Sequence, residues 1–231
     1  MTPSRPTIPL GVVSGKPSAE ALAQMDTHWR WRYVMLAPHR LGFLLAMVVL
    51  VTSGVWWALV QLDRSTGWLG LPLALSPTLV HSAVMAFGFI PLFFSGFLFT
   101  AGPKWLGVDP LPPQALRGPL LAQAVGWLLW LAGAHLHAVV ALAGLALAWC
   151  GLVAMTLQFW GRVRLSEAQD QLHAWVIAGA CTLGAISVGG LWLSLAWGAP
   201  ALARVWVFTG LWGFVVVVYV TVAHRMIPFF T

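Results

Sequence analysis

The sequence predicts an all-α protein, a polytopic bundle of six transmembrane helices preceded by an N-terminal amphipathic helix at the membrane surface. Of its residues, 60% are hydrophobic and 8% are charged, whereas about a quarter are charged in a typical soluble domain. Six apolar stretches are each long enough to cross a bilayer as a helix. Lys and Arg lie at the ends of these stretches, so membrane topology explains the net charge of +6 and no nucleic-acid partner is implied.

The first part of the chain differs from the rest in composition. Residues 1–17 are rich in Pro, Ser, Gly and Thr and are predicted to be disordered. Residues 18–38 follow a helical pattern in which Leu22, Trp29 and Leu36 can share one face. This pattern is typical of an interfacial helix that lies on the membrane.

The remaining residues, 39–231, are predicted to form the transmembrane domain. Its spans are expected at 40–61, 79–107, 119–134, 138–160, 173–197 and 203–224. The segment 102–118 contains four prolines and is expected to be a loop, because proline interrupts helices. Pro91, in the middle of the second span, is expected to kink that helix.

The basic residues predict the orientation of the spans. With six spans, both termini and two of the loops share one side of the membrane. Of the 12 Lys and Arg residues, only Arg64 and Arg204 fall on the other side, which leaves ten on the side of the termini. Because positively charged loops stay in the cytoplasm, both termini are predicted to be cytoplasmic.

Small residues at helical spacing indicate where helices approach closely. The fourth span contains Gly144-x-x-x-Ala148 and the fifth contains Ala185-x-x-x-Gly189. Such pairs leave room for a neighbouring helix. The pattern predicts tight packing but does not name the partner helix.

The sequence lacks the residues that several classes of chemistry require. All six acidic residues lie outside the spans or at their mouths, so no carboxylate is placed to relay protons or bind Na⁺ in the membrane, which argues against an ion-coupled transporter. There is no Ser/His/Asp set, no glycine-rich phosphate loop and no CxxC motif. Covalently attached haem is therefore not expected.

The histidines are the remaining candidates for a functional site. Six of them form two sets of three, one at each membrane surface: His39, His173 and His224 on the side of the termini, and His81, His135 and His137 on the other. Imidazoles at equal depth on different helices can bind a haem iron axially. Imidazole together with the thioether of Met85, one helical turn from His81, suits copper. The alternatives are solvated loop histidines at 135 and 137 and interfacial histidines at the helix ends.

The sequence contains three motifs, of which the central one combines Gly, Pro, Trp and His at fixed spacing. The central motif is His81-Ser-Ala-Val-Met85-Ala-Phe-Gly-Phe89, followed by Gly96-Phe-Leu-Phe-Thr100-Ala-Gly-Pro-Lys-Trp105-Leu-Gly107. The other two are residues 37–44 at the first span and 225–231 at the end of the chain. Together these motifs resemble the NnrS family of bacterial membrane proteins, whose pattern in the central motif is similar to His-x-His-Glu-Met-x-Phe-Gly-Phe. The chain has Ala83 and Val84 where that pattern has its second histidine and its glutamate.

The resemblance implies a haem- and copper-containing protein of the bacterial inner membrane with a role in nitric oxide response and denitrification. It implies haem b as the cofactor and either a redox partner or a second copy of the chain as a partner. Family members have more spans, and the transmembrane domain resembles their first half. No particular enzymatic reaction is implied.

The combined hypothesis assigns the cofactors to the two sets of histidines. An axial pair for haem is expected from His39, His173 and His224, with His81 as a further haem ligand at the other surface. Copper is expected on His81, Met85, His135 and His137. Two rival functions stay open: a subunit that anchors haem or quinone in a respiratory complex, and a transporter or channel with structural histidines.

Overall fold

The computed structural model describes residues 34–35 and 37–227 of the chain. The predicted disordered segment 1–17 lies outside the described residues. So does almost all of the predicted interfacial helix at 18–38, of which only the last residues are described.

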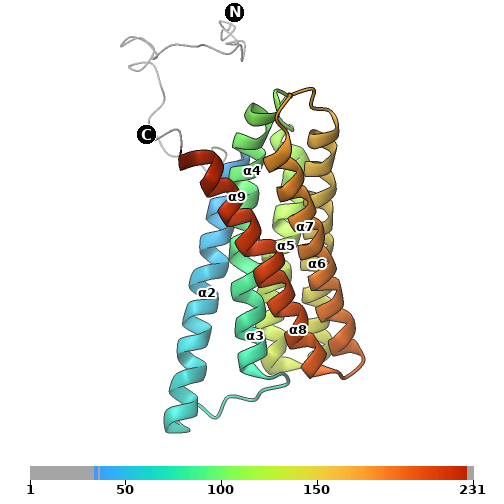
Figure 1. Cartoon of the computed structure of the whole chain (residues 1–231). Coiled ribbons are helices and arrows are strands. Elements are labelled where there is room, and N and C mark those ends of the chain that lie inside the picture. Colours follow the sequence, from blue (N-terminus) through green and yellow to red (C-terminus); the bar gives the residue numbers. More distant parts are fainter. Residues whose placement is uncertain (1–33, 36, 228–231) are drawn as a thin grey trace, which may run out of the picture. The chain divides into compact units, whose positions relative to one another are not determined.

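Six long helices make up the described part, and no strand occurs in it (Figure 1). All six are long and apolar enough to cross a membrane. The sequence-based fold class, an all-α polytopic bundle with six spans, is therefore confirmed. The elements in chain order are α2 (Pro38–Thr66), α3 (Pro77–Val84), the π-helical segment η2 (Met85–Phe89), α4 (Ile90–Leu106), α5 (Pro113–Leu136), α6 (Ala138–Arg164), α7 (Leu172–Ala196), α8 (Pro200–Gly210), the π-helical segment η3 (Leu211–Val216) and α9 (Val217–Met226).

The loop expected at 102–118 is shorter than the prediction. Helix α4 continues through Pro103 to Leu106 and ends at Gly107, which adopts a left-handed backbone (φ 63°) and donates its N–H to the carbonyl of Pro103. Helix α5 then begins at Pro113. A proline at the first helical position removes no hydrogen bond from the helix, because a backbone N–H at that position has no partner within the helix. The prolines thus mark helix ends here, and only residues 107–112 connect the two spans.

Helix α2 also extends beyond its expected end, to Thr66. Gly67 follows with a left-handed backbone (φ 65°). The carboxylate of Asp63 then accepts the backbone N–H groups of Leu69, Gly70 and Leu71 at 2.8–3.0 Å. A polar residue inside the helix therefore anchors the loop that follows it.

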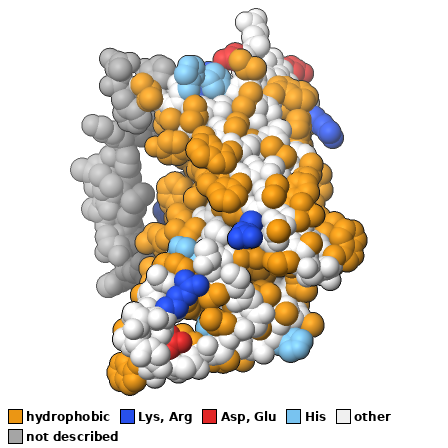
Figure 2. All heavy atoms as spheres, turned by 60° about the horizontal axis from the view of Figure 1, so that its bottom comes forward, with side chains coloured by type: hydrophobic (Ala, Val, Ile, Leu, Met, Phe, Trp, Pro, Cys, Tyr) orange, Lys and Arg blue, Asp and Glu red, His pale blue; other side chains and the backbone are white. Residues whose placement is uncertain are grey.

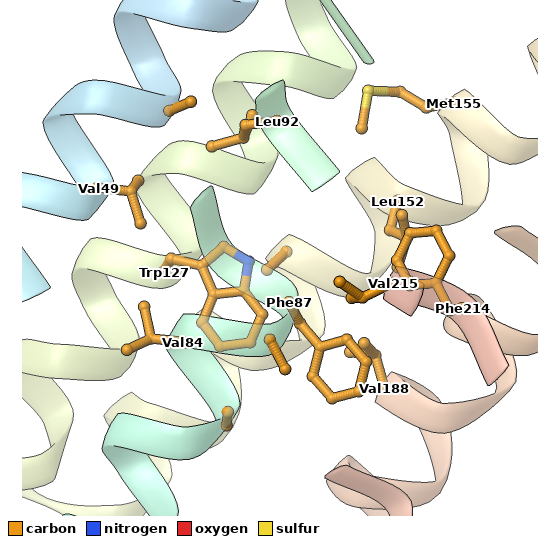
Figure 3. Packing of buried hydrophobic residues seen from close by; sticks show 14 of the residues in the cluster. Val49, Val84, Phe87, Leu92, Trp127, Leu152, Met155, Val188, Phe214 and Val215 are labelled. Atoms are coloured by element: carbon orange, nitrogen blue, oxygen red, sulfur yellow. The ribbon is translucent and has the colours of Figure 1, made fainter. Parts of the chain in front are cut away.

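The kink expected at Pro91 stays a prediction, but a π-helical segment, η2, ends two residues before this proline. A π-helical turn is one way for a helix to accommodate an interrupted hydrogen-bond ladder. A second π-helical segment, η3, interrupts the last span and was not predicted. The two segments pack near each other, because the ring of Phe87 in η2 lies against Gly210, the residue before η3. Figure 3 shows Phe87 in the core beside Trp127 and Val188.

The small residues pack as expected on α6 and differently on α7. A Cβ atom on Gly144 would lie 2.6 Å from the carbonyl oxygen of Gly126, so α5 and α6 approach closely there. On α7, the indole of Trp149 lies over Gly189 and donates its N–H to the carbonyl of Ala185 at 2.8 Å. The second pair of small residues therefore accommodates a side chain from α6 rather than a helix backbone.

The helix order determines which histidines lie at the same end of the bundle. We call the end where α2 begins and α9 ends the terminal end, and the opposite end, where α3 and α8 begin, the distal end (Figure 1). Helices α2, α7 and α9 bring His39, His173 and His224 to the terminal end, and α3 and the α5–α6 junction bring His81, His135 and His137 to the distal end.

Candidate functional site

Two histidines meet at the terminal end. His173 in the first turn of α7 and His224 in the last turns of α9 are 51 residues apart in sequence, yet Nε2 of His173 lies 3.0 Å from Nδ1 of His224. The two rings are nearly parallel, with an angle of 22° and centroids 5.3 Å apart. An ion pair between Arg225 and Asp170, 3.1 Å long, joins the same two helix ends. The end of α9 is thus held beside the start of α7.

The two ring nitrogens that face each other are close enough for a hydrogen bond, in which one donates and the other accepts with its lone pair. To hold a metal or haem iron together, the two imidazoles would have to break this contact and separate. The side chain of His224 is exposed near the helix end. The second nitrogen of His173, Nδ1, is buried and has no hydrogen-bond partner.

His39 contacts other residues than this pair. Its Nδ1 is 3.3 Å from the hydroxyl of Thr100 in α4, and its ring lies near Phe43. The Thr100 hydroxyl donates its own hydrogen to the carbonyl of Gly96, so its oxygen can only accept from His39. The proton of His39 is then on Nδ1, which leaves the lone pair on Nε2. A bonded N–H opposite a free lone pair is the arrangement usual for metal-binding histidines.

At the distal end, two of the three predicted histidines are already engaged. His135 donates from Nδ1 to the carbonyl of Pro72 at 2.7 Å, and its Nε2 accepts the indole N–H of Trp56 at 2.6 Å. The Nδ1 of His137 accepts the backbone N–H of Val139 and caps the start of α6. Both histidines therefore have structural roles in this conformation.

His81 and Met85 share a groove, as their spacing predicted. The groove has a volume of about 430 Å³ and lies between α3, η2 and the start of α4 on one side and α8 and η3 on the other. One face of the His81 ring stacks on the indole of Trp57, with an angle of 8° and centroids 4.2 Å apart. The sulfur of Met85 is 4.0 Å from the hydroxyl of Ser53.

The predicted copper ligands do not form a cluster in this structure. Within residues 34–35 and 37–227, no three His, Cys, Asp or Glu side chains are arranged to hold a metal ion. His81 and Met85 face the same groove, but His135 and His137 would have to release their present partners to join them. Copper binding by this set stays a prediction.

Sequence analysis missed the residues that surround the histidines. The sequence assigns no functional role to Trp56 and Trp57, but they contact His135 and His81. Thr100 was noted only as part of a motif. Arg204, which lines the groove beside His81, was used only for topology. A signal was present in the sequence, because Arg204 is one of only two basic residues predicted to lie on its side of the membrane.

Comparison with known proteins gives one family. The family model described as NnrS protein matches residues 33–231, which include all three of the motifs that resemble it. No curated protein and no solved structure matches the chain.

Proposed function

Because the chain belongs to the NnrS family, we propose that it is an inner-membrane protein that binds haem b at the terminal end and takes part in the bacterial response to nitric oxide and in denitrification. The observation that supports this most strongly is the contact between His173 and His224. Two imidazoles from distant parts of the sequence meet at 3.0 Å where apolar helices end.

The residues of the terminal end fit the chemistry of haem ligation. His173 and His224 would hold the iron, and the ion pair between Asp170 and Arg225 keeps their helices together. His39 is a third candidate ligand, with its Nε2 lone pair directed by the bond to Thr100. A bound haem supplies an iron that can exchange one electron or bind nitric oxide.

The experiment is a pyridine haemochrome assay on protein purified in detergent. We expect wild type to contain haem in a ratio near one per chain, and His173→Ala or His224→Ala to lower that ratio at least tenfold. The matched control is His137→Asn, which removes an imidazole from the distal end but keeps a side chain able to cap α6. Haem-free wild type, or equal loss in the control, would overturn the haem proposal.

The nitric oxide role needs a separate measurement. Nitric oxide added to the dithionite-reduced protein should shift the Soret band, since the iron must have an open or displaceable position to bind it. A spectrum that does not change would contradict nitric oxide binding and leave electron transfer as the function of the site.

The distribution of charge supports the orientation proposed for the chain in the membrane. Of the basic residues in the described part, Arg64 and Arg204 lie at the distal end, and the others lie at or near the terminal end. We expect a reporter fused after Gly198, in the turn between α7 and α8, to be periplasmic. A cytoplasmic reporter at that position would reverse the assignment.

A further inference from the structure

The groove at the distal end has the properties of a binding site for a lipid-soluble molecule. It lies between two membrane-spanning segments, and Figure 2 shows hydrophobic side chains interspersed with other atoms and with basic side chains on the face that it brings forward. Most of its lining is apolar, including Met85, Phe89, Phe208 and Leu211. A ligand that enters from the lipid must itself be largely apolar.

The polar groups that line this groove are hydrogen-bond donors near the distal end. His81 has a buried Nδ1 without a partner, and its Nε2 is accessible and has no partner among the described residues. With no acceptor beside Nδ1, a proton on that nitrogen would be buried and unpaired, which is costly. The proton is therefore better placed on Nε2, which makes His81 a donor to the groove. Arg204 adds a guanidinium, for which no carboxylate partner occurs in the described structure.

We propose that this groove binds a lipid-soluble quinone. A quinone has carbonyl oxygens that accept hydrogen bonds, as His81 and Arg204 require, and a flat apolar ring with an apolar tail. The aromatic rings of Phe89 and Phe208 and the thioether of Met85 suit such a ring. The proposal concerns binding at the distal end and does not depend on haem at the terminal end.

The donors favour a quinone over a phospholipid head group. A lipid phosphate stays hydrated at the membrane surface, where it can meet an arginine. His81, in contrast, lies within α3 with one ring face covered by Trp57. A carbonyl oxygen loses little hydration when it enters such a position, whereas a phosphate loses much. Engagement of both His81 and Arg204 is thus the feature that identifies the ligand class.

The helix backbone around the groove is unusual in a way that agrees with a binding role. Met85 belongs to η2 and Leu211 to η3, so both π-helical segments contribute to the lining. Single π-helical turns in membrane and soluble helices occur frequently at functional sites. Here two of them meet at one groove.

The test is thermal unfolding of detergent-purified protein titrated with a short-tailed benzoquinone or naphthoquinone. A ligand that binds the folded state raises the unfolding temperature, and the stabilisation grows with the logarithm of ligand concentration above its Kd. We expect such a rise with wild type, and an apparent Kd, obtained by fitting this dependence, at least fivefold weaker for both His81→Phe and Arg204→Gln. His81→Phe keeps a ring to stack on Trp57 and removes only the donor.

A second groove in the protein provides the matched control. It has a volume of about 360 Å³, lies between α6 and α7, and includes Trp160 and Arg164 but no histidine. Arg164→Gln should leave quinone affinity unchanged. Leu211→Trp, which fills the distal groove from η3, should weaken binding even if His81→Phe fails to fold.

Three results would overturn the proposal. The first is no rise in the unfolding temperature of wild type with either quinone. The second is equal weakening in Arg164→Gln, which would indicate partition into apolar surface in general. The third is a response to phosphatidylglycerol that depends on Arg204 but not on His81, which would identify a phospholipid site instead.

Discussion

The two ends of the bundle each contain three of the described histidines, but they use them differently. At the terminal end, His173 and His224 contact each other, and the proton of His39 is positioned by a hydroxyl. At the distal end, each imidazole is paired with an indole or the backbone: His135 with Trp56 and His81 with Trp57, and His137 with the start of α6.

The difference shows that depth in the membrane does not decide the role of a histidine. What decides it is which groups the neighbouring helices present. In the pair of His173 and His224, one nitrogen of each ring is engaged in their mutual contact, whereas both ring nitrogens of His135 are engaged with other groups. The proposed haem site therefore lies at the terminal end, whereas His135 and His137 at the distal end have structural contacts.

The largest expected effect comes from removing both members of the terminal pair. In the double variant His173→Ala and His224→Ala, haem should be lost completely, because no second ligand is left in contact. The equivalent double variant at the distal end, His135→Asn with His137→Asn, should keep the wild-type haem content. Haem per chain, measured by pyridine haemochrome after purification, checks the contrast. Haem loss confined to the distal variant would reverse the roles of the two ends.

The contribution of His39 is tested through Thr100 rather than through the histidine itself. Thr100→Val keeps the shape of the side chain but frees the imidazole proton. If His39 is a ligand, loss of such a supporting bond should weaken haem affinity about 10- to 100-fold. Haem transfer to apomyoglobin measures this. The control is Thr156→Val, which removes a similar hydroxyl-to-backbone bond on α6 with no histidine nearby. An unchanged affinity in Thr100→Val would exclude His39 as a ligand.

The sequence was sufficient to predict the number and positions of the spans because bilayer thickness imposes a length on every span. All six spans were placed correctly, with ends that differ by several residues. The end of α2 lies at Thr66 rather than at residue 61. The loop expected at 102–118 is shortened at both of its ends, since Pro103 lies in the last turn of α4 and Pro113 begins α5. A proline near a helix end can lie within the last turn of that helix or begin the next one, and packing against residues that are close in space determines which of these occurs.

The contacts of the site could be predicted only in part. The shared face of His81 and Met85 follows from helical periodicity, and the structure agrees. The meeting of His173 with His224, and of His135 with Trp56, depends on how helices rotate about their axes. That rotation is set by side-chain packing across the whole bundle, and apolar helices with weak amphipathic character give little local information about it.

A smaller effect is expected at the distal end from His135→Phe. The indole N–H of Trp56, which is nearly buried, would lose its acceptor. The Pro72 carbonyl would also lose its donor, but it belongs to an exposed loop residue. We expect a loss of about 1–2 kcal/mol in the free energy of unfolding, measured by denaturation in mixed micelles. The double variant of His135→Phe with Trp56→Phe should lose less stability than the sum of the two single variants, because the unpaired indole N–H is then absent as well. Full additivity would show that the bond contributes nothing.

The smallest effect is expected from His137, whose role is to cap α6. His137→Ala removes the acceptor for the Val139 N–H and should lower the free energy of unfolding by about 1 kcal/mol, the usual cost of a lost N-cap. His137→Asn should restore most of that stability, since asparagine is a preferred capping residue. Neither variant should change haem content. A drop in haem with His137→Asn at unchanged stability would mean that the imidazole itself binds the cofactor, and the distinction between the two ends would then fail.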